Sequence, residues 1–290
     1  MSGELFPDRL AKRLGALSIV SKSGRLGHHK GTHRSRKTGS SLDFSDFREY
    51  HPGDDLRHID WNVYARTDKP FIKQFLDEQE MRIHILLDPT KSMGADDKWD
   101  YSRQLAVALG HIALKSGDTV SFSTWSDERD YFFRRKGVAH RASVTKFISA
   151  IDTPSSTRSF SDNTLKHIPK AATVLFIITD GLEEIEKWEH LFRRLPGVCR
   201  DVRIVTVHSK SEEKPEYEGD VRFVDIESGN GVEVTITGRS ISEYEEKKSA
   251  HEARLSILTL KYGIGLMRAE VSDGAMETVT KKMRHIGWLR

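Results

Sequence analysis

Cysteine is almost missing from this chain of 290 residues, and long apolar runs are missing altogether. The single cysteine, Cys199, excludes a disulfide within the chain and any metal site built from several cysteines. No stretch approaches the ~20 apolar residues that a membrane-spanning helix needs. Residues 1–15 also lack the apolar stretch of a secretory signal. We therefore expect a protein of the reducing cytoplasm.

Three catalytic signatures are missing as well. The chain has no G-x-x-x-x-G-K-[ST] phosphate loop, which argues against nucleotide hydrolysis by the chain itself. It has no G-x-S-x-G nucleophile elbow. The pair His251-Glu252 is not followed by a histidine at the spacing of a zinc protease. These absences lead us to expect a protein that is not an enzyme.

The charge of the chain is unevenly distributed. The formal net charge is +3, yet residues 1–40 hold nine Lys and Arg against Glu4 and Asp8. This basic arm could contact phosphates or an anionic surface, or it could pair with the more acidic remainder of its own chain. Its basic residues are Arg9, Lys12, Arg13, Lys22, Arg25, Lys30, Arg34, Arg36 and Lys37.

From residue 81 onward, apolar strands alternate with helical patterns. Strands are expected at 82–88, 119–125, 130–133, 172–180, 201–208, 221–226, 232–237 and 264–269. Helices are expected at 98–115, 143–151, 161–168, 183–195, 240–261 and from 275. This alternation predicts a doubly wound α/β fold, a mainly parallel sheet with helices on both faces.

Residues 1–80 have a different character and are predicted to be a separate N-terminal part, followed by the α/β domain at 81–290. Apolar residues at near-helical spacing predict a short helix within residues 4–22. Residues 23–42 are rich in Gly, Ser and cations and are expected to be an extended loop. We expect residues 39–80 to be an extended segment that packs on the sheet.

Two of the predicted strands end on an acid. Asp88 opens a D-x-T-x-S loop with Thr90 and Ser92, and Asp180 closes the strand that ends in Ile178-Thr179-Asp180-Gly181. The carboxyl ends of parallel strands meet at one sheet edge, where ligands of such folds bind. Thr157, in an intervening loop, offers a third hydroxyl. Carboxylates and hydroxyls are hard oxygen ligands suited to Mg²⁺ or Mn²⁺. The alternative is that both acids merely cap the helices beside them.

This pattern resembles the metal-ion-dependent adhesion site of the von Willebrand factor A fold. In that family a D-x-S-x-S loop, a later loop Thr and an Asp that closes a strand in T-D-G hold the ion. The resemblance assigns these roles to Asp88, Thr90, Ser92, Thr157 and Asp180. It also implies a von Willebrand factor A-like, Rossmann-type domain that binds a protein partner through the ion.

The segment before the domain resembles the signature of the bacterial "domain of unknown function 58" family. That signature reads F-x-x-x-R-x-Y-x-x-G-D-D-x-R-x-I-D-W, then A-R, then an E before the first sheet strand. The matching residues are Phe44, Arg48, Tyr50, Gly53, Asp54, Asp55, Arg57, Ile59, Asp60, Trp61, Ala65, Arg66 and Glu80.

Residue chemistry indicates a structural clasp in this run. Its arginines can pair with Asp54, Asp55 or Asp60, and Trp61 can supply a large buried area. We therefore predict that the run docks onto the sheet domain. A catalytic role for these aspartates or for His58 is the alternative.

The family resemblance implies work alongside MoxR-type AAA+ ATPases in the assembly or maturation of protein complexes. Relatives often continue into membrane helices and a small β domain, and we expect this chain to be a short, soluble form. The leading hypothesis is a metal-dependent protein-binding adaptor. A metal-dependent hydrolase of phosphate-containing substrates and a nucleic-acid-associated factor that uses the basic arm remain alternatives.

Overall fold

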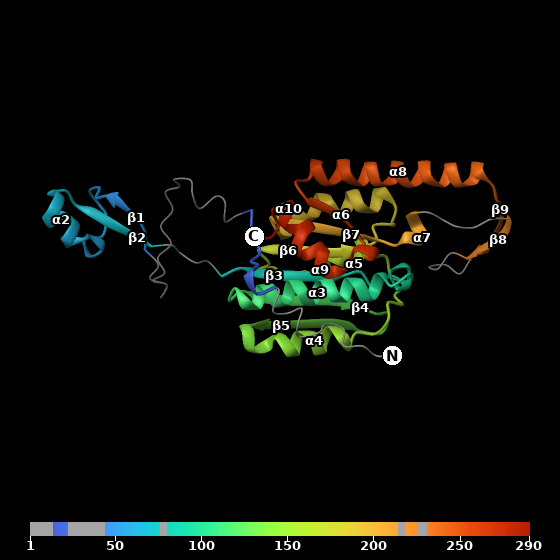
Figure 1. Ribbon diagram of the computed structural model, residues 1–290, viewed down its shortest axis with the longest axis horizontal. Helices are drawn as coiled ribbons and strands as arrows, with labels where there is room; N and C mark the ends of the chain where they lie inside the picture. Colours follow the sequence, from blue (N-terminus) through green and yellow to red (C-terminus); the bar gives the residue numbers. More distant parts are fainter. Residues whose placement is uncertain (1–13, 23–43, 76–79, 214–218, 225–230) are drawn as a thin grey trace. The chain divides into compact units, whose positions relative to one another are not determined.

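The computed structural model describes residues 14–22, 44–75, 80–213, 219–224 and 231–290. The chain divides into two compact units. The sheet unit contains residues 1–28 and 81–290, and the small unit contains residues 29–80. Figure 1 labels the helices and strands of both.

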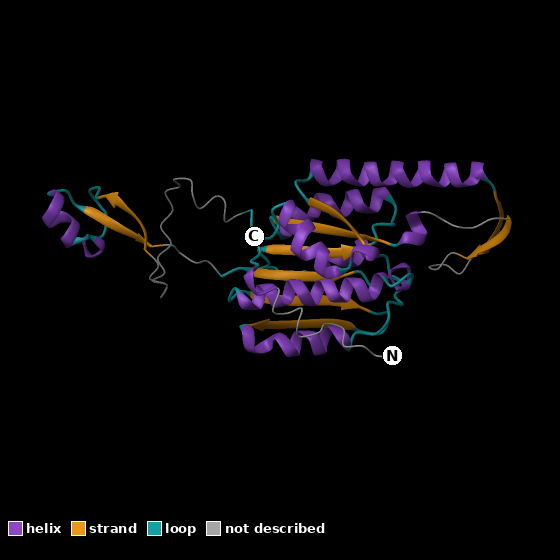
Figure 2. Ribbon diagram, in the orientation of Figure 1, coloured by secondary structure: helices purple, strands orange, loops and turns teal. Residues whose placement is uncertain are grey.

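A six-stranded sheet forms the centre of the sheet unit (Figures 1 and 2). All neighbouring strands pair in parallel except the last two, β4 and β5, which are antiparallel. The predicted α/β fold with a mainly parallel sheet is confirmed. Across the sheet the strands are β10 (Gly265–Glu270), β7 (Asp201–His208), β6 (Val174–Thr179), β3 (Arg82–Leu87), β4 (Thr119–Trp125) and β5 (Asp130–Lys136).

Helices cover both faces of the sheet, because alternate residues of a strand point to opposite sides. In β3, Ile83 and Ile85 face one buried core, whereas Leu86 faces the other. The first core is covered by α3 (Lys98–Lys115), α4 (Arg141–Ser149), α9 (Ala275–Glu277) and α10 (Met283–His285). The second core is covered by α5 (Phe160–Thr164), α6 (Ile185–Val198) and α8 (Gly238–Lys261).

The start of the described chain belongs to the sheet unit and differs from its prediction. Within residues 14–22, the helix expected over residues 4–22 is reduced to one 3-10 turn, η1 (Leu14–Ala16). Beyond it, Ile19 forms an antiparallel bridge with Leu289, and both side chains are buried. Because these apolar side chains complete the first core, the segment belongs with residues 81–290 rather than with the rest of residues 1–80.

The small unit is a two-stranded antiparallel sheet with one helix in the connection. Its elements are β1 (Phe44–Glu49), α2 (Trp61–Thr67) and β2 (Phe71–Phe75). Ile59 and Ile72 pair across a bridge and are its buried apolar side chains among those described. The docking of residues 39–80 on the sheet stays a prediction.

Two of the predicted Arg–Asp pairs are present in the small unit. Arg48 lies 2.9 Å from Asp54, and Arg57 lies 2.7 Å from Asp55. Asp60 instead caps α2, since its carboxylate accepts hydrogen bonds from the N–H groups of the second and third helical residues. Arg66, the third arginine of the run, donates to a backbone carbonyl within α2. The aspartates thus have structural partners close by.

Trp61 was predicted to be a buried anchor of the clasp; within the small unit its side chain is 62% exposed, so its burial by docking stays a prediction. As the first residue of α2 it meets Tyr64 edge-on, with ring centroids 6.0 Å apart. Little apolar area leaves water, so Trp61→Ala should cost less than about 1 kcal/mol of local unfolding free energy. The matched control Ile72→Ala should cost about 2–5 kcal/mol. Hydrogen exchange of the α2 and β2 amides measures both, and equal losses would contradict this expectation.

An antiparallel hairpin precedes the longest helix. Its strands are β8 (Gly219–Val224) and β9 (Gly231–Ile236), as the sequence predicts, and its turn lies outside the described residues. The first half of α8 is mostly exposed, whereas Leu255 and Leu258 in its second half are buried. Among the described residues, no helix combines the length and the apolar character needed to cross a bilayer.

A buried histidine makes the stability of the sheet unit depend on pH. His84 of β3 is fully buried, with ring nitrogens 2.9 Å from the Ser121 hydroxyl and 2.8 Å from the Ser123 hydroxyl. Burial lowers the pKa of His84 to about 3. The unfolded chain, with an ordinary histidine pKa of about 6.5, therefore binds more protons between these two values. The contribution of neutral His84 to the free energy of unfolding is therefore complete above pH 6.5 and is lost as the pH falls toward 3.

We expect His84 to contribute a slope of about 1.4 kcal/mol per pH unit between pH 6 and 5. Urea unfolding at several pH values would measure it. His84→Gln should flatten the slope by that amount, whatever its effect on stability at pH 7.5. Parallel curves for the wild type and the variant would contradict the prediction.

Candidate functional site

The loop after β3 brings three of the predicted ligands together. Asp88 directly follows the strand and is buried. Its Oδ1 accepts hydrogen bonds from the Thr90 backbone N–H at 2.9 Å and from the Thr90 hydroxyl at 2.7 Å. The hydroxyl oxygens of Thr90 and Ser92 lie 3.2 Å apart. One carboxylate and two hydroxyls therefore gather at the carboxyl end of β3.

Asp180 reaches the same edge from β6. The two strands pair in parallel with Leu87 opposite Ile178, so the residues after them leave the sheet side by side. The Thr179 hydroxyl donates to Asp88 Oδ2 at 2.6 Å. Asp180 is 5% exposed. Both acids thus lie at the switch point of the sheet, where the strand order reverses between β3 and β6.

The two carboxylates form an electrostatically strained pair. Burial and the negative charge of Asp180 raise the pKa of Asp88 to about 7, although hydrogen bonds from Thr179 and Thr90 act in the opposite direction. The Thr90 hydroxyl donates its proton to Asp88 and keeps an oxygen lone pair for another partner. A divalent cation would stabilise both acids, and the donor set of carboxylate and hydroxyl oxygens fits Mg²⁺ or Mn²⁺.

Thr157, the fifth predicted ligand, lies in an adjacent loop. Its neighbour Ser156 forms a parallel bridge with Thr90, and the Ser156 N–H donates to the Pro89 carbonyl at 3.0 Å. The exposed Thr157 hydroxyl donates to Asp127 Oδ2 at 2.8 Å, and the Ser156 hydroxyl donates to Asp127 Oδ1 at 2.9 Å. Four of the five predicted residues therefore gather at the edge, while Thr157 stands beside them with Asp127 as its partner.

Glu183 fixes the far end of the Thr157 loop. Its carboxylate accepts hydrogen bonds from the Ser159 hydroxyl at 2.8 Å and from the N–H groups of Phe160 at 2.7 Å and Ser161 at 2.9 Å. Glu183 follows Asp180 by three residues, so it joins the loop after β6 to the loop that carries Thr157.

Lys98 places an ammonium group in the same cluster, although its side chain is 1% exposed. Its Nζ donates to Asp180 Oδ2 at 3.2 Å and to Glu212 Oε1 at 2.6 Å. Burial lowers the pKa of Lys98, but the charges of Asp180 and Glu212 outweigh burial, and the pKa lies above its ordinary value. Lys98 therefore remains a cation beside one of the candidate ligands.

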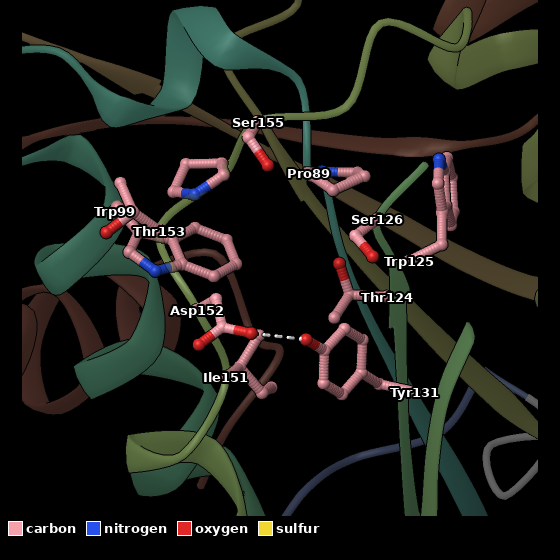
Figure 3. A pocket seen from close by; sticks show the side chains of 11 residues that line it. Pro89, Trp99, Thr124, Trp125, Ser126, Tyr131, Ile151, Asp152, Thr153 and Ser155 are labelled. Carbon is pink, nitrogen blue, oxygen red and sulfur yellow. Dashed lines mark hydrogen bonds between the residues drawn. The ribbon is translucent and has the colours of Figure 1, made fainter. Parts of the chain in front are cut away.

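A small cavity borders the Asp88 loop (Figure 3). Pro89, Trp99 and Ser155 are among the residues that line it, and the Tyr131 hydroxyl donates to Asp152 at 2.7 Å. Its volume of about 10 Å³ is close to that of a single water molecule. The cavity is too small for an organic substrate.

Asp127, Glu183 and Lys98 were not predicted from the sequence. Asp127 follows the strand 119–125 by two residues, so its place at the carboxyl edge could have been found by the logic applied to Asp88. Lys98 offers no such signal, because lysine at the start of a predicted helix is ordinarily exposed.

The chain matches one protein family and several curated relatives. The family described as "Protein of unknown function DUF58" matches residues 46–254. Uncharacterized proteins of Mycobacterium tuberculosis and Mycobacterium bovis are each 25% identical over 262 residues, which cover 87% of this chain and 82% of each relative. The family match spans all five predicted ligands and the signature residues from Arg48 to Glu80.

Two solved structures also resemble the chain. The conserved hypothetical protein BatB from Bacteroides thetaiotaomicron is 13% identical, with a TM-score of 0.39 and coverage of 71% of this chain and 98% of that one. An aerotolerance-related membrane protein from Bacteroides fragilis is 13% identical, with a TM-score of 0.40 and coverage of 71% and 99%.

Proposed function

This chain belongs to the family described as "Protein of unknown function DUF58", and we propose that it is a metal-dependent protein-binding module with a von Willebrand factor A-like domain. One Mg²⁺ or Mn²⁺ would be held at the edge formed by Asp88 and Asp180. The hydroxyls of Thr90, Ser92 and Thr157 would complete the protein's share of the ligands.

The arrangement of the sheet supports the domain assignment. The first, fourth and fifth core strands lie next to one another, and the edge strand β5 is antiparallel. In the von Willebrand factor A family, a D-x-S-x-S loop and an Asp that closes a later strand in T-D-G hold the ion. Here Asp88 follows β3 and Asp180 follows β6, which are the first and fourth core strands.

The observation that carries the proposal is the pair of buried carboxylates with hydroxyl oxygens beside them. Neutral hydroxyls add no charge, and the Lys98 ammonium lies 3.2 Å from Asp180, so the charge of a divalent ion would be only partly offset. An open coordination position would then attract an Asp or Glu of a partner. Partner and ion would each strengthen the binding of the other, because coupling between two ligands is reciprocal.

We further propose that the partner is a MoxR-type AAA+ ATPase and that this chain is its cytoplasmic adaptor in the assembly or maturation of protein complexes. The family resemblance motivates this partner. The nucleic-acid alternative rests on the basic arm, of which Lys22 alone is described. Lys22 is engaged within its own chain, since its Nζ donates to the Gly263 carbonyl at 2.8 Å.

A capture experiment with a purified MoxR-type ATPase of the same organism tests the proposal. Mg²⁺ is kept constant, so that the nucleotide site of the ATPase is undisturbed while the adaptor is varied. Asp88→Ala should weaken capture at least tenfold, and Asp162→Ala, a change at an exposed acid of α5, should leave it unchanged. Equal capture by all three proteins would refute an ion-mediated contact at Asp88.

The proposal also predicts that the chain alone turns over neither ATP nor a generic phosphoester above background in the presence of Mg²⁺. The reasons are the missing phosphate loop and the lack of a general base that the motif ties to the cation site. Phosphate release measured over hours checks this. Steady turnover that is lost in Asp60→Asn or His58→Ala would establish the enzymatic alternative instead.

A further inference from the structure

An internal cation already stands at the edge where the divalent ion is proposed to bind. The Lys98 ammonium lies 3.2 Å from Asp180 Oδ2. Its second partner, Glu212 Oε1, is closer at 2.6 Å. Asp180 keeps its other oxygen on the Leu182 N–H at 3.2 Å. One candidate ligand of the ion is thus already paired with a positive charge of the chain itself.

Glu212 is fixed by several hydrogen bonds, so it can remain paired with Lys98 when Asp180 binds another cation. Glu212 lies in the short helix α7 (Lys210–Glu213), and its Oε2 accepts a hydrogen bond from the Ser209 N–H at 3.1 Å. Its backbone carbonyl accepts from the Tyr244 hydroxyl and from Lys248 Nζ, each at 3.0 Å. These contacts fix Glu212 between the end of β7 and the helix α8.

We propose, on the basis of the cation site proposed above, that Lys98 is a built-in counter-ion that sets the affinity of this site. Without a divalent ion, Lys98 neutralises Asp180. When the ion binds, the contact between Lys98 and Asp180 breaks and the contact between Lys98 and Glu212 remains. The buried ammonium therefore always has a carboxylate partner. The site therefore stays intact when empty, at the expense of weaker ion binding.

Two substitutions should change the affinity in opposite directions. Lys98→Met removes a positive charge next to a ligand of the ion, and the affinity for Mn²⁺ should rise at least tenfold. Glu212→Gln removes the second partner and leaves Lys98 entirely to Asp180, so the affinity should fall by about tenfold. Lys248→Met is the matched control, because it removes a lysine that contacts Glu212 but not Asp180, and its affinity should stay within threefold.

Titration of the full chain with Mn²⁺, with the free ion followed by electron paramagnetic resonance, measures these affinities. Circular dichroism melting checks that each variant is folded. If Lys98→Met fails to fold, Glu212→Gln carries the test, since that side chain is 22% exposed. An unchanged or lower affinity in folded Lys98→Met, or an unchanged or higher one in Glu212→Gln, would overturn the role of Lys98.

The same titration separates this inference from the cation site on which it rests. Binding that is lost in Asp88→Asn yet unaffected by Lys98→Met would uphold the site and remove the counter-ion. An absence of binding in the wild type and in Lys98→Met alike would remove both. Tight binding in Lys98→Met that disappears in Lys98→Met/Asp88→Asn would establish both.

Discussion

Arg203→Met should lower the free energy of unfolding of the sheet unit by about 3–5 kcal/mol, the range for removing one partner of a buried ion pair. Arg203 is 2% exposed, and its guanidinium donates to both Asp201 carboxylate oxygens, at 2.9 and 2.8 Å. It also donates to the carbonyls of Trp288 and Val20. Methionine would leave a fully buried carboxylate and two backbone carbonyls without this donor.

Arg203 thus joins β7 to residues near both ends of the chain. The double variant Arg203→Met/Asp201→Leu provides the control, because apolar side chains often replace a whole buried ion pair at little cost. It should recover most of the lost stability in urea unfolding. A single variant within about 1 kcal/mol of the wild type would show that the pair contributes little.

Asp88→Asn should weaken divalent cation binding at least about 100-fold, since even the neighbours of metal ligands commonly contribute 10–100-fold. The fold should survive. The amide keeps an oxygen for Thr90, and it removes the charge that faces Asp180 in a buried site. Calorimetric titration with Mn²⁺ and a thermal melt of the same sample measure both effects. Asp162→Asn, at an exposed position, should change neither.

Unaltered Mn²⁺ affinity in Asp88→Asn would mean that any bound ion lies elsewhere. If Asp88→Asn lost both its melting transition and its affinity for Mn²⁺, Asp88 would be needed for the fold itself. The proposal requires the affinity to fall while the fold remains.

The sheet and the two acids could be predicted because they follow from local patterns. An apolar strand that ends on an acid puts that acid at the carboxyl edge, and parallel pairing brings two such ends together. Asp88 and Asp180 meet for this reason, and Leu87 opposite Ile178 shows the register. The helix Lys98–Lys115 also begins and ends where the sequence predicts, because its apolar face and its Ser116-Gly117 stop are local features.

Features that depend on contacts between distant segments could not be predicted in this way. Lys98 is buried because Asp180 and Glu212, 82 and 114 residues further along the chain, converge on its ammonium group. Ile19 is extended rather than helical because it pairs with Leu289 at the other end of the chain. Trp61 was expected to be buried by docking on the sheet, and within the small unit it is 62% exposed.

We propose that one divalent ion binds between the ends of β3 and β6. Anomalous diffraction at the manganese edge, from crystals of the full chain soaked with Mn²⁺, tests it most directly. We expect one peak within roughly 2.0–2.3 Å of the Thr90 and Ser92 hydroxyls, with Asp88 and Asp180 bound directly or through water. A peak at the cluster of His208, Glu213 and Glu252 instead, or no peak at the Asp88 edge in crystals that take up the ion, would refute this site.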